Sequence, residues 1–170
     1  MNRKFQASYK FGLIGGAFCV ISFVIFQLLG IDPTKLSMLF GYILIPVFLF
    51  IGIRYYRNEV NDGLLSFSEG MTAGFLIYSL IAAISGIGIW IILIISPSLY
   101  EEIKAQKIDL LEGNKELIVE QMGIESYDIT YQSLLKMTTI DIATNDFIWK
   151  IIPGLFFTII ISIILRRNFK

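Results

Sequence analysis

The sequence predicts an all-α, polytopic membrane protein with four transmembrane helices and a short helical cap on the extracytoplasmic side. Hydrophobic residues make up 55% of the 170 residues, more than the roughly 45–50% that is usual for a soluble domain. These residues gather in four long runs, and one of them, Met71–Ile95, carries no charge. At about 1.5 Å per residue this run is longer than the hydrocarbon core of a bilayer. We therefore expect a single membrane domain over residues 1–170, with the lipid bilayer as its first partner.

The spans are expected at about residues 11–29, 36–53, 67–95 and 147–165. The first run, Phe11–Leu29, is too long for the apolar part of a signal peptide and lacks a cleavage site, so we interpret it as an uncleaved helix. The second run contains Pro46, which predicts a kink. It ends in paired arginines and tyrosines, which are typical of a membrane interface.

The third span begins after the Asn61-Asp62-Gly63 turn. Ser66 and Glu69 have the spacing of a capping box, in which each side chain satisfies a free N–H group of the helix start. The stretch 96–146 is predicted to be an extracytoplasmic insertion of short amphipathic helices with an excess of acids. Lys150 follows near the start of the fourth span, where we expect its ammonium group to reach the interface.

Small residues recur at helical spacing within the spans and predict close contacts between helices. The helix-packing positions are Gly12, Gly16, Gly70, Gly74 and Gly154. Because Gly74 shares a stripe with Gly70, Gly74→Leu is expected to disturb the bundle more than Gly88→Leu.

The basic residues predict the orientation. Every arginine falls beside the termini or in the connection between the second and third spans. The basic residues of the insertion are all lysines. The positive-inside rule then places both termini in the cytoplasm.

The composition argues against most catalytic chemistry. The chain has no histidine and one cysteine, Cys19, within the first span, so the usual metal sites and nucleophile–base pairs lack their residues. Lys and Arg (14) balance Asp and Glu (14), so nothing in the net charge points to nucleic acid. We expect a non-enzymatic protein that needs no cofactor.

Two polar positions are candidates for a functional role, Gln27 within the first span and Glu69 at the start of the third. A transporter normally places an ionisable residue within the membrane, and the four predicted cores contain none. The sequence therefore favours an accessory or assembly subunit with a protein partner. A small homodimeric transporter or carrier is the alternative.

The motifs I-R-Y-Y-R at 53–57 and G-L-L-S-F-S-E-G-M-T-A-G at 63–74, with a final helix that ends in Arg166-Arg167, resemble those of the DUF4199 family. Members are small four-span membrane proteins of Bacteroidetes-type bacteria without an assigned activity. The resemblance implies a multi-pass protein of the bacterial inner membrane and leaves the function open.

Overall fold

The computed structural model describes residues 3–167 and consists of helices, joined by short connections. The chain divides into two compact units, residues Met1–Ile89 with Ala143–Lys170, and residues Trp90–Ile142. The side chains of Arg3, Lys4 and Lys170, which contributed to the predicted orientation, lie outside the described part.

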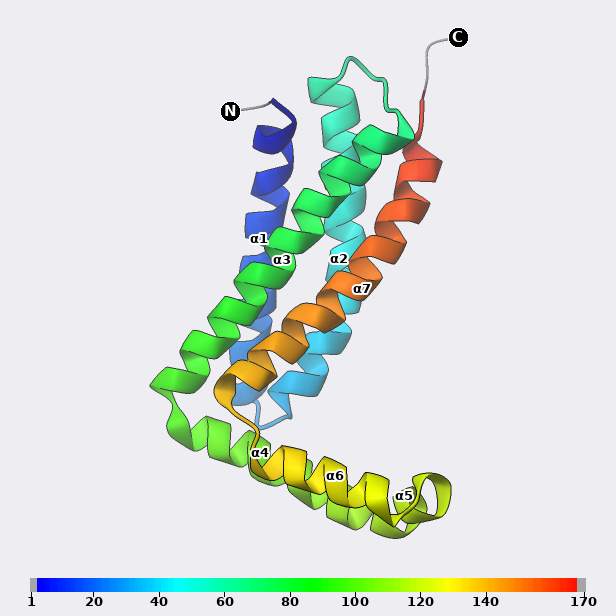
Figure 1. The fold of residues 1–170 in the computed structure, drawn as a ribbon. Coiled ribbons are helices and arrows are strands. Elements are labelled where there is room, and N and C mark those ends of the chain that lie inside the picture. Colours follow the sequence, from blue (N-terminus) through cyan, green and yellow to red (C-terminus); the bar gives the residue numbers. More distant parts are fainter. Residues whose placement is uncertain (1–2, 168–170) are drawn as a thin grey trace. The chain divides into compact units, whose positions relative to one another are not determined.

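Four helices of the described chain are long and apolar enough to cross a membrane: α1 (Arg3–Leu28), α2 (Pro33–Tyr55), α3 (Phe67–Ile95) and α7 (Thr139–Leu165). They form a bundle in which the start of α1, the α2–α3 connection and the end of α7 lie at one end (Figure 1). The predicted all-α membrane fold is confirmed.

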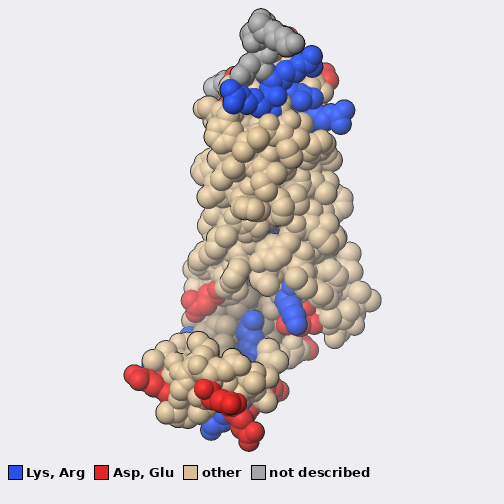
Figure 2. Space-filling view, turned by 90° about the vertical axis from the view of Figure 1, so that its right-hand side faces the viewer, with Lys and Arg blue, Asp and Glu red and all other residues tan. Residues whose placement is uncertain are grey.

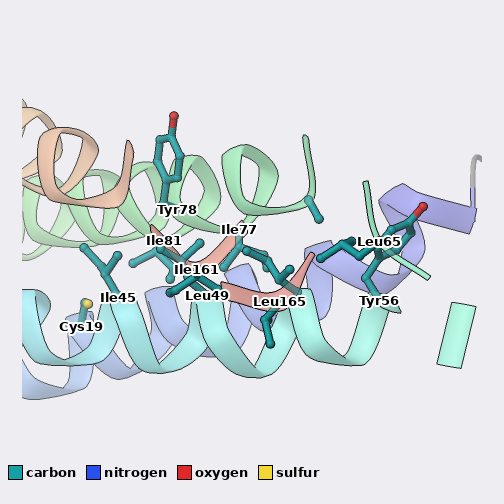
Figure 3. Packing of buried hydrophobic residues seen from close by; sticks show 12 residues of the cluster. Cys19, Ile45, Leu49, Tyr56, Leu65, Ile77, Tyr78, Ile81, Ile161 and Leu165 are labelled. Atoms are coloured by element: carbon teal, nitrogen blue, oxygen red, sulfur yellow. The ribbon is translucent and has the colours of Figure 1, made fainter. Parts of the chain in front are cut away.

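The bundle core is apolar and is contributed by all four helices (Figure 3). Ile45 and Leu49 of α2 and Ile77 and Ile81 of α3 have no exposed surface. Large apolar side chains on the outer faces are instead exposed, such as Ile43, which is 65% exposed. Since burying such a side chain is favourable by about 1.5–3 kcal/mol, lipid is the medium in which this surface is stable.

The start of α7 differs most from the sequence prediction. We expected the fourth span to begin at Phe147, but α7 begins at Thr139, about two turns earlier. The reason is a cap: Asp141 accepts hydrogen bonds from the Thr138 backbone N–H at 2.8 Å and from the Thr138 hydroxyl at 2.7 Å. This arrangement satisfies donors at the helix start.

The second helix also begins earlier than the expected Leu36. Pro33 occupies its first turn, and the Asp32 carboxylate accepts from the Thr34 backbone N–H at 2.9 Å. After Tyr55 the helix widens into a π-helical turn, η1 (Tyr56–Val60).

The second unit contains three short helices, α4 (Pro97–Gly113), α5 (Lys115–Met122) and α6 (Ile124–Leu135). Two hydrogen bonds join α4 to the end of α6: Tyr100 donates to the Met137 carbonyl, and Lys104 donates to the Leu135 carbonyl at 2.7 Å. Near the other end of α4, the Glu112 carboxylate repels the charged form of Tyr131 and accepts from its hydroxyl, which raises the pKa of that phenol.

Basic side chains gather at one end of the bundle (Figure 2). The residues that carry this charge include Arg57, whose guanidinium donates to the Leu165 carbonyl, and Arg167, which pairs with Leu65 in an isolated β-bridge. The basic residues at the end of α7 and those of the α2–α3 connection are therefore neighbours in space. This clustering is the arrangement that the positive-inside argument assumed.

Candidate functional site: a buried acid–base pair in the bundle

Asp146 and Lys150 form an ion pair on the inner face of α7. They are one turn apart, and the Lys150 ammonium contacts Asp146 Oδ1. The Lys150 side chain has no exposed surface, and that of Asp146 is 9% exposed. Buried charges of this kind are costly unless they are paired and hydrogen-bonded.

Helices α3 and α2 contribute to the surroundings of this pair. From α3, the Ser85 hydroxyl donates to Asp146 Oδ2 at 2.7 Å. From α2, Gly41 presents bare backbone: a methyl group built at this position would lie 3.1 Å from Lys150 Cε and 3.8 Å from Nζ. Gly41 thus makes room for the lysine stem.

Two sequence predictions are corrected by this pair. Lys150 does not extend its ammonium to the membrane interface, and the four spans are not free of ionisable residues. At about 1.5 Å per residue, Lys150 lies ~24 Å along α7 from Arg166, which is less than the ~30 Å thickness of the hydrocarbon core. A carboxylate one turn away neutralises the ammonium where it is, so the side chain has no need to extend.

The sequence contains a signal for this pair that the prediction did not use. Gly154, Thr158 and Ser162 follow one another at four-residue intervals along one face of the fourth span. The same interval continued backwards reaches Lys150 and then Asp146. All five residues are buried in the structure.

Glu69 belongs to a different site, at the basic end of the bundle. Its Oε2 accepts from the Ser66 backbone N–H at 3.0 Å and from the Ser66 hydroxyl at 2.9 Å, and the Glu69 N–H donates to that hydroxyl. Tyr56 and Asn61 also donate to the carboxylate, at 3.4 and 3.3 Å. The capping box predicted from the sequence is therefore present, and it also joins the end of α2 to the start of α3.

We expect Glu69→Gln to keep the stability of the wild type, because one amide oxygen can accept from Ser66 and Asn61 while the amide N–H₂ donates to Tyr56. Glu69→Ala removes every one of these bonds and should lower the free energy of unfolding by about 1–3 kcal/mol. Thermal unfolding of both variants in detergent measures the difference. Equal losses in the two variants would show that the charge itself, and not the hydrogen bonding, is what matters.

Gln27 is partly exposed on α1, and the structure gives its side chain no hydrogen-bond partner among the described residues. It does not join the Asp146–Lys150 pair. The two polar positions selected from the sequence therefore lie outside the buried pair.

The five selected glycines lie against side chains of neighbouring helices. A methyl group at any of them would come within 2.3–2.7 Å of another helix's side chain. The contacts are Gly12 with Leu80, Gly16 with Ile84, Gly70 with Ser162, Gly74 with Thr158 and Gly154 with Tyr78. Gly88 is as close to Val20, at 2.4 Å, so the structure gives no reason for Gly88→Leu to be the milder change.

No group of three or more His, Cys, Asp or Glu residues in the described part of the chain is arranged to hold a metal ion. The bundle does offer a carboxylate, Asp146, paired with an ammonium group, Lys150, inside the membrane-spanning region. The Ser85 hydroxyl donates a hydrogen bond to this carboxylate.

Comparison with known proteins identifies the family. No curated protein and no solved structure matches the chain. The family model described as protein of unknown function, DUF4199, matches residues 10–167. That range includes most of the first span, the other three spans, the second unit and the Asp146–Lys150 pair. The chain is a member of the DUF4199 family.

Proposed function

We propose that this integral membrane protein is a non-enzymatic accessory or assembly subunit of a membrane complex. The observation that supports the proposal is the apolar surface of the second unit. Leu110, Leu117, Met122 and Ile124, on and beside α5, are 68%, 53%, 67% and 53% exposed. Large apolar side chains that are exposed outside the membrane-spanning helices are candidates for a surface that a partner covers.

The proposed location is the inner membrane of a bacterium, with both termini in the cytoplasm. The exposed positions Glu59 and Glu112 report on the two sides. In a Cys19→Ala background, Glu112→Cys should react with a membrane-impermeant thiol reagent in cells with a permeabilised outer membrane, and Glu59→Cys should not. Labelling of Glu59→Cys alone would contradict this orientation.

The subunit proposal is tested by purification in a mild detergent followed by mass spectrometry. We expect a stoichiometric protein partner that is lost from the double variant Leu117→Ser, Met122→Ser. A matched variant at two lipid-facing positions of the bundle, Ile43→Ala with Ile163→Ala, should retain it. A partner that survives the first double variant would contradict the role of this surface.

A small homodimeric carrier is the second candidate, and the Asp146–Lys150 pair is the observation that favours it. Ionisable residues within a membrane often mark the path of an ion or substrate. A homodimer without other partners, by light scattering, would support the carrier. So would loss of function at normal abundance in Gln27→Leu or Glu69→Gln, since neither change should disturb a protein that only assembles with others.

A further inference from the structure

The Lys150 ammonium group can donate more hydrogen bonds than the one that it makes to Asp146. An ammonium group has three N–H donors, and the described residues give this one a single acceptor, Asp146 Oδ1. With no exposed surface, the other two donors cannot reach bulk water. Buried donors in this position need an acceptor nearby.

A second polar group lies on α2, the helix that packs against Lys150. The Ser37 hydroxyl is fully buried and has no hydrogen-bond partner among the described residues. Ser37 is one turn from Gly41, the residue whose backbone faces the lysine stem, so both lie on the same buried face of α2.

We propose that the bundle binds an internal water molecule at this point, between Lys150 on α7 and Ser37 on α2. Such a molecule accepts from the Lys150 ammonium and donates to the Ser37 hydroxyl, which gives it two polar partners, within the range of a buried water. The Asp146–Lys150 pair is neutral, so an anion at the same place would leave a net charge inside the membrane. Water satisfies the donors without that cost, and the proposal holds for a subunit and for a carrier alike.

Ser37→Ala tests the proposal by thermal unfolding. If water bridges Ser37 and Lys150, losing the hydroxyl weakens the site, and Tm should fall by about 2–4 °C. If the hydroxyl is simply unsatisfied, its removal should leave Tm unchanged or raise it. Ser162→Ala is the matched control, because that hydroxyl is equally buried and unpartnered but lies against Gly70, not beside a charge.

A fall for Ser37→Ala with no fall for Ser162→Ala supports the water site. An unchanged or higher Tm for Ser37→Ala, or an equal fall in both variants, overturns it. A Tm that depends on chloride when compared with gluconate would overturn the assignment of water.

Discussion

Lys150→Met is expected to lower the free energy of unfolding by about 3–5 kcal/mol, the usual effect of removing one partner from a buried ion pair. The variant leaves the Asp146 carboxylate within the bundle, with Ser85 as its one remaining side-chain hydrogen-bond donor among the described residues. Thermal unfolding in detergent, at matched protein and detergent concentrations, measures the loss.

The double variant Asp146→Asn, Lys150→Met should recover most of that stability. It removes both charges together, and an asparagine oxygen can still accept from Ser85. Lys35→Met, at an exposed position, is the control and should stay within about 0.5 kcal/mol of the wild type. A double variant no more stable than Lys150→Met would mean that packing of the lysine stem, rather than pairing of the charges, accounts for the loss.

Gly74→Leu is the second change with a large expected effect. A methyl group at Gly74 would lie 2.3 Å from Thr158 Cγ2, so α3 and α7 must separate to admit the side chain. Overpacking of this kind costs about 1–3 kcal/mol, and we expect the upper end because both residues are buried.

Gly113→Leu is the matched control, since a methyl group at Gly113 meets nothing within 4 Å. Its unfolding temperature should stay close to that of the wild type. A similar loss in both variants would show that the helix contact at Gly74 is not what makes the substitution harmful.

The four spans could be predicted from the sequence because lipid imposes a length and a composition on each of them. The box at Ser66 and Glu69 could be predicted as well, since its residues are close in sequence and its geometry is local. The early start of α7 was missed because its cap, Thr138 and Asp141, precedes the apolar run by several residues. An apolar run predicts which residues lie in lipid, whereas the capping residues indicate where the helix itself begins.

The buried pair was missed for a different reason. A lysine near the end of an apolar run can reach the interface or turn inward, and composition does not distinguish the two. The lysine turns inward only if other helices supply polar partners and room for its side chain. Here Ser85 on α3 donates to Asp146, and Gly41 on α2 leaves space for the lysine stem. Contacts between segments that are far apart in the sequence cannot be predicted from the residues of one segment alone. The four-residue stripe through Gly154 was the one local clue.

Amine modification tests most directly the claim that Lys150 is sealed inside the bundle. Native membranes are treated with an amine-reactive ester that crosses the bilayer, and the modified lysines are quantified by mass spectrometry. We expect Lys35, which is exposed, to react rapidly and Lys150 to remain unmodified until the protein is unfolded in strong detergent. Modification of Lys150 in folded protein at the rate of Lys35 would contradict the buried pair and place the ammonium at the membrane interface.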